Sequence, residues 1–544
     1  MPNAILALMY DSLPFLDLRY ISVRRNTALL GAVLLLAGLF LSGCKLPFIR
    51  EPVDPYLPYY PALKESYRAD LVATNPVAQQ MPRYDITFSL NPNAEKGENA
   101  LRGSQSVHIL NPGPDPWPYL IFRLYPMLEQ YGGSFSIGSM AVNGQPVAYT
   151  FVPLGTGVRI DLPQPLLAGQ STTVQMNWSL SIPFWPDSPG VYALFGRSQE
   201  MISLPLFYPA LAVYQPGPTL GTGKWWEENG TVRGDAAFNV SSLFVVTGTL
   251  PSDQIPVTSG VVVTSTVLEN GSTQRVWVTG PVREFLLHTS SRFEKSSAEV
   301  AGTKVTSYWL PGQNAAGRAA LNYAVAAMRV YNDQFGDYPF TEMAVAVAPL
   351  EYRGMEYPQV SLIGVQSYTD YRGELEFLIA HEVAHQWWYQ MVHNDPVTYP
   401  WMDEGLAEYS VRVYYEAMQG PSTADGLQNQ RWQVPVNLLI ERDSDTELGK
   451  PVDAYDSGSQ YETVVYGKGA LFFAAARKAL GERAFEQFLH SYLADNLWTV
   501  VTPETLFTQL DLAAHPALAT LVDEWGVRFF VPTPVAPVVP TPQP

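Results

Sequence analysis

The pattern of apolar side chains changes once along this chain of 544 residues, at about residue 294. From about 84 to 293, short stretches alternate apolar with polar side chains, and pairs such as Asn-Gly and Pro-Gly separate them. A period of two is typical of strands that bury one face. Beyond this point helix-forming residues repeat at helical spacing, first at 314–334. We therefore expect an α+β multidomain protein, with an antiparallel β domain at 76–293 and a mainly α domain at 294–530.

The second domain is expected to contain several further elements. Two β-like stretches, at 343–349 and 357–365, follow the first helical segment. Helical spacing then predicts helices at 373–392, 402–418, 467–480, 482–495 and 503–528.

Composition limits the classes of protein to which the chain can belong. Its hydrophobic content of 47% is enough for large cores, which excludes a chain that is disordered over most of its length. The 51 Asp and Glu outnumber the 33 Lys and Arg, so the chain lacks the basic excess that a nucleic-acid partner requires. Its single cysteine, Cys44, excludes an intramolecular disulfide and a thiolate cage for a metal. A transition metal would have to be held by carboxylates and by some of the seven histidines.

An apolar run near the N-terminus resembles an export signal. Leu29–Leu41 follows Arg24 and Arg25 and leads into Leu-Ser-Gly-Cys, as in bacterial lipoprotein signals. The run has the length of a signal's hydrophobic region and is short for a membrane span. This resemblance predicts a signal peptide at 1–43, lipidation of Cys44, and a lipoprotein anchored in the membrane on the extracytoplasmic side of the bacterial cell envelope. A buried core cysteine and an uncleaved signal anchor are the alternatives.

Two proline-rich segments flank the two domains. Residues 44–75 are rich in Pro and Tyr and are expected to form a stalk, or an extended segment that wraps around the protein. Residues 531–544 have low complexity and favour polyproline II, which cannot bury a core. We therefore expect a disordered tail there.

The string His381-Glu382-Val383-Ala384-His385 has the spacing of a metal site. On a helix, side chains four residues apart share a face, so both imidazoles can bind one ion, and Glu382 lies beside them. Glu404 follows His385 by nineteen residues and offers a carboxylate. Two His and one Glu leave a fourth position open, as catalytic zinc sites do. These residues predict one Zn²⁺ per chain and an activated water. The alternative is a solvated helix face with two unrelated histidines.

These residues lie within motifs that resemble the aminopeptidase N family of gluzincin zinc metallopeptidases. HEVAHQWW at 381–388 and WMDEGLAEY at 401–409 look like the zinc-binding segments of that family. GMEYP at 354–358 is similar to its exopeptidase motif, and YGKGA at 466–470 is similar to a third segment. The motifs follow the family's order, and the resemblance covers about residues 80–530. It implies that the mainly α domain is a thermolysin-like zinc-peptidase domain.

The resemblance implies a role for each matched residue of the metal site. His381, His385 and Glu404 look like the zinc ligands. Glu382 looks like the general base that takes a proton from the zinc-activated water and passes it to the leaving amine. Tyr466 matches a tyrosine whose hydroxyl stabilises the oxyanion of the tetrahedral intermediate.

Other matched residues imply that the substrate is held by its N-terminus. Glu356 matches the carboxylate that binds the free α-amine. Gly354 and Met355 lie on the strand that would run along the peptide, and the glycine permits a close backbone approach. The family has Asn where this chain has Tyr357, so we expect a different hold on the substrate backbone.

Two further contacts have alternatives. Glu408 lies one helical turn after Glu404, and it either orients a ligand imidazole or is a solvated residue. A second contact to the substrate amine would come from the β domain, through Gln199 or Glu200, as is frequent in that family.

The sequence favours a zinc-dependent aminopeptidase that hydrolyses N-terminal residues from peptides or protein N-termini. The chain resembles a short form of the family that lacks the C-terminal helical-repeat domain, so we expect an open cleft. A zinc endopeptidase is the first alternative, if Glu356 does not face the site. A catalytically inert surface binding lipoprotein is the second.

Overall fold

The computed structural model describes residues 54–69, 71, 76–185, 194–198, 200–227, 233–351 and 353–527. The expected signal peptide, Cys44 and the proline-rich tail lie outside these residues. From Tyr56 onward the chain forms one compact unit. Among the described residues, no helix combines the length and the apolar character that crossing a bilayer requires.

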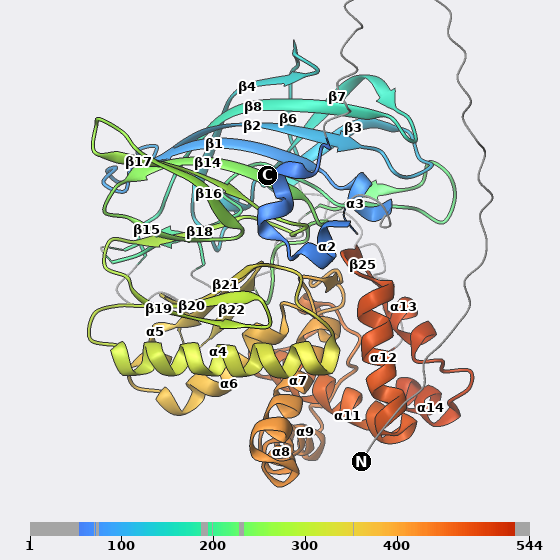
Figure 1. The fold of residues 1–544 in the computed structure, drawn as a ribbon. Helices are drawn as coiled ribbons and strands as arrows, with labels where there is room; N and C mark the ends of the chain where they lie inside the picture. The colour runs from blue at the N-terminus through green and yellow to red at the C-terminus, as the bar shows by residue number, and fades with distance from the viewer. Residues whose placement is uncertain are drawn as a thin grey trace, which may run out of the picture. The chain divides into compact units, whose positions relative to one another are not determined.

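An eight-stranded sheet dominates the N-terminal half of the chain (Figure 1). In spatial order its strands are β16 (Val261–Val267), β17 (Ser272–Val278), β14 (Leu243–Pro251), β1 (Arg83–Leu90), β2 (Leu101–Leu110), β8 (Ser171–Ser181), β4 (Ser134–Val142) and β5 (Gln145–Pro146). The alternation seen in the sequence sets the buried face. In β1, for example, Tyr84, Ile86 and Phe88 are buried and the residues between them are exposed.

One pair in this sheet departs from the expected arrangement. Strands β1 and β14 run parallel, with Arg83 opposite Leu243, whereas the other neighbouring pairs are antiparallel. In this sheet the expected antiparallel pairing is therefore confirmed except at this one pair. About 150 residues separate the two strands, which is ample for a connection that returns to the same end of the sheet.

Two four-stranded sheets and a short hairpin complete the β domain. The first sheet has the order β15 (Ile255–Thr258), β18 (Leu286–Ser290), β10 (Ile202–Pro205) and β9 (Gly196–Arg197). The second has the order β11 (Ala210–Leu211), β3 (Trp117–Arg123), β7 (Gly157–Leu166) and β6 (Thr150–Phe151). The hairpin pairs β12 (Tyr214–Gln215) with β13 (Lys224–Trp225). The loop from β13 to β14 reaches the second domain, where the Tyr389 hydroxyl donates to the Ala237 carbonyl at 3.0 Å.

The segment before β1 is packed against the protein. It contains η1 (Leu57–Ala62), α2 (Glu65–Ala69) and α3 (Pro76–Gln80). Leu63 is fully buried and pairs with Phe340, and the Thr341 amide donates to the Ala62 carbonyl at 3.0 Å. From Tyr56 onward the expected stalk is therefore wrong, and the alternative of a wrapping segment describes these residues. Buried apolar side chains, which a solvated stalk would expose, account for the difference.

The second domain begins with a five-stranded sheet. In spatial order its strands are β19 (Glu294–Val300), β20 (Thr303–Trp309), β21 (Glu342–Ala348), β23 (Val360–Gly364) and β22 (Gly354–Tyr357). The sequence pattern predicts two β-like stretches here, over β21 and β23, and the family resemblance predicts a strand at Gly354 and Met355, where β22 lies. Strand β19 is polar and largely exposed, so its composition carries little strand signal. Strand β22 is at the edge of the sheet, so one side of its backbone is available to an added strand.

Helices form the rest of this domain, which confirms the expected change from β to mainly α structure (Figure 1). Helix α4 (Asn314–Phe335) packs on β19 and β20. The others are α5 (Val365–Tyr368), α6 (Leu375–Ala384), α7 (Trp401–Gln419), α8 (Pro421–Gln428), α9 (Val434–Glu441), α10 (Gly458–Glu462), α11 (Gly469–Leu480), α12 (Glu482–Asp495), α13 (Pro503–Gln509) and α14 (Pro516–Glu524). Two π-helical turns join helices end to end, η6 (Asn429–Gln433) between α8 and α9, and η8 (Thr463–Lys468) between α10 and α11.

Two predicted helices have different ends in the structure. The helix predicted at 373–392 stops at Ala384, because the chain then turns and the Gln390 amide donates to the His385 carbonyl at 3.0 Å. This turn leads into β24 (Val392–His393), which pairs with β25 (Thr499–Val500). The helix predicted at 503–528 is divided into α13 and α14, and Pro516 starts the second of them.

Candidate metal centre and cleft

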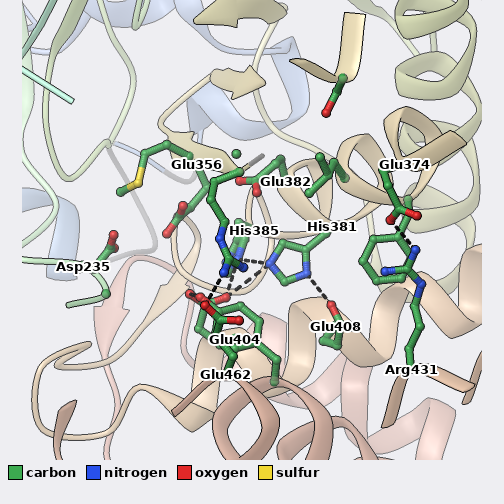
Figure 2. A pocket seen from close by; sticks show the side chains of 18 of the residues that line it. Asp235, Glu356, Glu374, His381, Glu382, His385, Glu404, Glu408, Arg431 and Glu462 are labelled. Carbon is green, nitrogen blue, oxygen red and sulfur yellow. Dashed lines mark hydrogen bonds and ion pairs between the residues drawn. The ribbon is translucent and has the colours of Figure 1, made fainter. Parts of the chain in front are cut away.

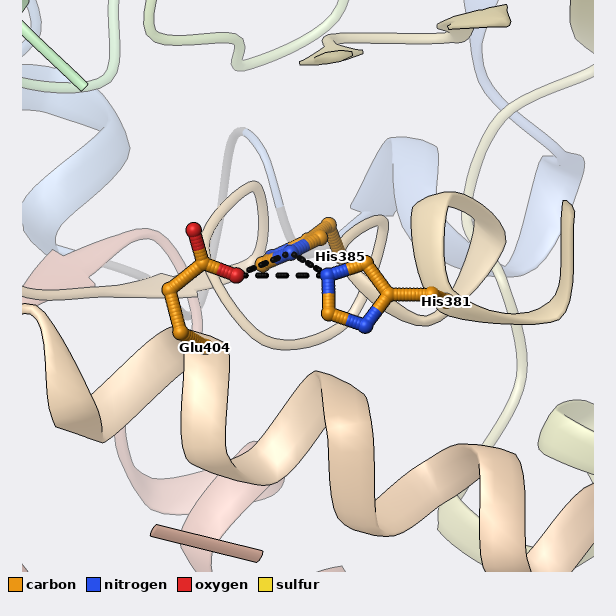
Figure 3. A group of neighbouring side chains, drawn as sticks. All are labelled: His381, His385 and Glu404. Atoms are coloured by element: carbon orange, nitrogen blue, oxygen red, sulfur yellow. Dashed lines mark hydrogen bonds and ion pairs between the residues drawn. The ribbon is translucent and has the colours of Figure 1, made fainter. Parts of the chain in front are cut away.

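Two helices bring three metal-binding side chains together (Figure 3). His381 and His385 lie at the C-terminal end of α6, and Glu404 lies in the first turn of α7. The Nε2 atoms of the two histidines are 3.1 Å apart, and Glu404 Oε2 lies 3.2 Å from each of them. Both histidines are buried, and Glu404 is nearly so. Three donor atoms thus converge on one point, as they do around a shared cation.

The protein holds the ring nitrogens that face away from this point. His385 Nδ1 donates to the Trp388 carbonyl at 3.0 Å. His381 Nδ1 lies 3.0 Å from Glu408 Oε2, and Glu408 accepts a hydrogen bond from Trp432 Nε1 at 2.7 Å. With a proton on each Nδ1, the Nε2 lone pairs face the shared point. Glu408 is buried behind a ligand imidazole and is not a solvated residue.

The electrostatics of the centre suit a divalent cation. Burial alone would raise the pKa of Glu404, but hydrogen bonds from His381 and His385 outweigh it and hold this pKa well below its usual value. Burial lowers the pKa of His381, whereas Glu404 and Glu408 raise it by more. The donor set thus has two imidazole nitrogens and one carboxylate, from Glu404, while Glu408 adds a second negative charge behind His381. This donor set fits Zn²⁺.

Glu382 lies between the metal centre and strand β22. It is 4% exposed, and its Oε2 atom has no hydrogen-bond partner among the described residues. Burial raises the pKa of Glu382 to about 8, although His381 and Arg353 oppose the change. A Cβ atom on Gly354 would lie 2.1 Å from Glu382 Oε1. Glycine is therefore needed at 354 to make room for the Glu382 carboxylate, a reason that the sequence did not suggest.

Tyr466 reaches the metal centre from the π-helical turn η8. Its hydroxyl donates to Glu404 Oε1 at 2.5 Å. Its ring stacks on the imidazole of His381, with 5.8 Å between the centroids. The phenol is therefore already beside the metal ligands and needs no large movement to reach a group bound there.

Two further carboxylates lie together at one end of the cleft (Figure 2). Glu356 on β22 is 5% exposed, and its backbone carbonyl accepts a hydrogen bond from Gln390. Asp235, in the loop between β13 and β14, lies beside Glu356. Burial raises the pKa of Glu356 well above its usual value, and the charges of Asp235 and Glu382 add to the increase. Burial also raises the pKa of Asp235. A positive charge between the two carboxylates would favour their ionised forms and lower both pKa values.

The sequence did not single out Asp235. It lies about 120 residues before Glu356 in a loop without a recognisable motif, and it is one of 51 acidic residues. The residues proposed for this contact were Gln199 and Glu200. The structure places Glu200 in an exposed ion pair with Arg292, and Gln199 lies outside the described residues. The β domain thus contributes a carboxylate from a different loop.

All these functional side chains line one cleft of about 390 Å³ (Figure 2). Gly354 and Met355 form part of its wall. Tyr357 is only 2% exposed, and its carbonyl accepts a hydrogen bond from Gln386 Nε2 at 3.0 Å. Its side chain is not among the residues that line the cleft, so the change from Asn to Tyr357 affects packing beside the site.

Comparison of sequences places the second domain in a known family. Residues 319–525 match the peptidase family M1 domain. Aminopeptidase M1-C of Oryza sativa subsp. japonica is 23% identical over 245 residues, which are 41% of this chain and 27% of that protein. Probable aminopeptidase 2 of Sulfurisphaera tokodaii is 22% identical over 253 residues, which are 43% of this chain and 31% of that protein. The chain thus spans about a quarter to a third of the length of these relatives.

Solved structures extend the likeness to the fold of both domains. The M1 zinc metallopeptidase from Deinococcus radiodurans superposes with a TM-score of 0.61 at 21% identity, covering 84% of this chain and 96% of that one. A mutant described as a two-domain M1 zinc metallopeptidase bound to L-arginine gives the same TM-score at 20% identity, with 84% and 96% coverage. The match to the peptidase family M1 domain and the convergent donor atoms of α6 and α7 together support a zinc metallopeptidase domain at residues 319–525.

Proposed function

We propose that this zinc metallopeptidase is an aminopeptidase that removes single residues from free N-termini. The observation that carries the proposal is the buried carboxylate pair of Asp235 and Glu356 beside the metal centre (Figure 2). Among the described residues, neither carboxylate forms an ion pair within 4.0 Å. The charge of Arg283 already acts on Asp235, and a substrate α-ammonium would add a positive charge between the two carboxylates and fix the cleaved bond one residue from the N-terminus.

The edge strand β22 provides the surface along which the peptide lies. An extended peptide added to this strand would place its amine at Glu356 and its first peptide bond near Gly354, where Glu382 is packed. The same cleft holds the three metal ligands, so the bond to be cleaved lies beside them. With the amine at Glu356 and the cleaved bond near Gly354, two residues away along the strand, the enzyme would cleave only the first peptide bond.

The protein groups divide the reaction between them. Zinc, when held by His381, His385 and Glu404, supplies Lewis acidity and a water of lowered pKa. Glu382 accepts the proton from the attacking water and delivers it to the leaving amine. Tyr466 donates its hydroxyl hydrogen bond to the oxyanion of the tetrahedral intermediate, in exchange for the one it now donates to Glu404.

The relatives support peptides as the substrate class. Several of the matched proteins are named aminopeptidases, and a mutant of the Deinococcus radiodurans enzyme is described as bound to a Tyr-Ser-Ala substrate. For this chain we propose peptides or protein N-termini.

Cleavage of blocked and free substrates tests the proposal. Amino-acid arylamides and their N-acetylated forms are compared, with and without a zinc chelator. We expect chelator-sensitive cleavage of the free-amine forms only. Cleavage of the acetylated forms would favour the endopeptidase, and no cleavage of either with zinc bound would favour an inert binding protein.

A substitution that keeps the shape of the base but removes its charge tests the mechanism. Glu382→Gln is expected to keep zinc and lose at least about a hundredfold in kcat, since general base catalysis contributes about that much. Glu269→Gln, at an exposed position away from the cleft, is the matched control and should keep full activity. Full activity in Glu382→Gln would refute the assignment.

We also propose that Cys44 carries a lipid anchor, on the basis of the sequence around it. Labelling of cells with a fatty acid should mark the wild-type protein and leave Cys44→Ser unlabelled. An unlabelled wild-type protein would contradict the proposal.

A further inference from the structure

One of the cations that line the cleft, Arg431, lies apart from the carboxylate pair. Among the described residues that line the cleft, the only Lys or Arg side chains are Arg353 and Arg431. Figure 2 shows Asp235 and Glu356 on one side of the metal ligands and Arg431, with Glu374, on the other. A molecule with an ammonium group at one end and a carboxylate at the other would match this distribution.

The spacing of residues along strand β22 indicates where Arg353, the residue just before the strand, would lie relative to the substrate. Glu356 would bind the amine, and Gly354 lies against Glu382, where the bond is cleaved. Continuing in the same direction, the next residue is Arg353. The three steps from Glu356 to Arg353 span about 10 Å in extended backbone, which is the length of about three peptide residues. The backbone of Arg353 would therefore lie beside the leaving part of the substrate, at about its second or third residue, and its long side chain also reaches the neighbourhood of Glu382.

Both guanidinium groups form ion pairs with half-exposed carboxylates. Arg353 pairs with Glu462 on α10, and their side chains are 39% and 43% exposed. Arg431 pairs with Glu374, at 37% and 42% exposure, and lies 3.7 Å from the ring centroid of Phe377. Ion pairs at this exposure contribute little to stability, so a substrate carboxylate can displace Glu462 at low cost. The planar guanidinium can also hold a carboxylate through two parallel hydrogen bonds.

We propose that Arg353 binds a carboxylate at the third residue of the substrate, and that this group is the free C-terminus of a tripeptide. Arg431, on the opposite side of the metal ligands from Asp235 and Glu356, would hold the carboxylate of a longer peptide (Figure 2). The inference rests on the proposed aminopeptidase function and adds to it a preference for short peptides with a free carboxyl end.

The ratio of kcat/KM for a free acid to kcat/KM for the corresponding amide tests the proposal. A variant that loses activity on both substrates equally leaves this ratio unchanged. kcat/KM is measured for one tripeptide as the free acid, as the C-terminal amide, and as an amide with Glu at the third position. We expect the wild-type enzyme to prefer the acid over the amide by about tenfold, as a charge-assisted hydrogen bond can provide. Preference for the Glu-containing amide instead would overturn the C-terminus as the source of the carboxylate.

Arginine variants complete the experiment. Arg353→Gln should bring the acid-to-amide ratio close to one, and Arg353→Lys should restore part of the preference. Arg442→Gln, at an exposed position outside the cleft, is the matched control and should keep the wild-type ratio. Zinc content and melting temperature verify that each variant is folded.

The outcomes separate this inference from the function on which it rests. Equal rates for the wild-type acid and amide, or an unchanged ratio in Arg353→Gln, would refute carboxylate binding by Arg353 while free-amine arylamides are still cleaved. If the wild-type enzyme does not cleave free-amine arylamides, the proposed function fails and this inference falls with it.

Discussion

Replacement of Gly354 by alanine tests the position of the general base with a single methyl group. Gly354 does not have a positive φ, so alanine can adopt its backbone conformation. The added Cβ atom would lie 2.1 Å from Oε1, 2.3 Å from Cδ and 2.4 Å from Cγ of Glu382. The three nearest atoms therefore all belong to the one side chain that we assign as the base.

The size of the effect follows from these distances. Carbon and oxygen atoms that are not bonded approach to about 3.3 Å even in weak hydrogen bonds. The carboxylate of Glu382 must therefore move by about 1 Å. A misplacement of this size in a catalytic group costs about a hundredfold in rate, or about 2.7 kcal/mol in activation free energy. The metal ligands are not among the nearest atoms, so zinc binding should be unchanged.

The assay measures kcat on a free-amine arylamide, together with zinc stoichiometry and thermal unfolding. Gly426→Ala is the control, because a Cβ atom at this position in α8 meets no atom within 4 Å. It should keep full activity and gain about 0.5–1 kcal/mol in stability. A folded, zinc-loaded Gly354→Ala with kcat within threefold of wild type would refute the placement of Glu382 as the base.

Three further substitutions test separate parts of the structure. Asp235→Asn removes one charge of the carboxylate pair and should raise KM for free-amine arylamides by about tenfold with zinc retained, since a charged hydrogen bond is worth roughly 1.5–3 kcal/mol; an unchanged KM would remove Asp235 from the amine site. Glu408→Gln weakens the hold on His381 Nδ1 and should lower zinc affinity by about 10–100-fold in competition with a chelator, and equal affinity would contradict its orienting role. Glu284 is 2% exposed, and burial raises its pKa from 4.5 to about 7. The folded state then binds more protons than the unfolded state between these values, so stability falls as pH rises from 4.5 to about 7, by roughly 3 kcal/mol. Urea unfolding at pH 5 and pH 8 measures this fall in the free energy of unfolding, and Glu284→Gln should remove it. If the variant differs from wild type by the same amount at both pH values, the raised pKa of Glu284 is not its cause.

The residues of the metal centre were predictable because their geometry is local. His381 and His385 are four residues apart, and helix geometry alone places their rings on one face. Glu404 needed only a second helix packed against the first. The order of the two domains was also predictable, because the change of hydrophobic period extends over hundreds of residues.

Contacts between distant segments were not predictable in this way. Asp235 reaches Glu356 only because a loop of the β domain folds against the second domain, and no local pattern records that contact. The same holds for Gly354, whose neighbour Glu382 is 28 residues away in sequence. Strand β19 was missed because its side chains are mostly polar. Its backbone hydrogen bonds to β20 hold it as a strand, and these do not depend on its side chains.

The π-helical turn η8 makes α10 and α11 a single helix whose two halves are out of phase. One extra residue in a turn rotates everything beyond it by about 100° relative to an uninterrupted α-helix. This offset lets Glu462, the last residue of α10, pair with Arg353 at the cleft while Phe472 on α11 packs on Trp401. Deletion of Thr463 would bring the halves into phase, and the helix could then satisfy only one of these contacts. The ion pair beside the cleft and the packing of the helix behind it therefore depend on the same surplus residue.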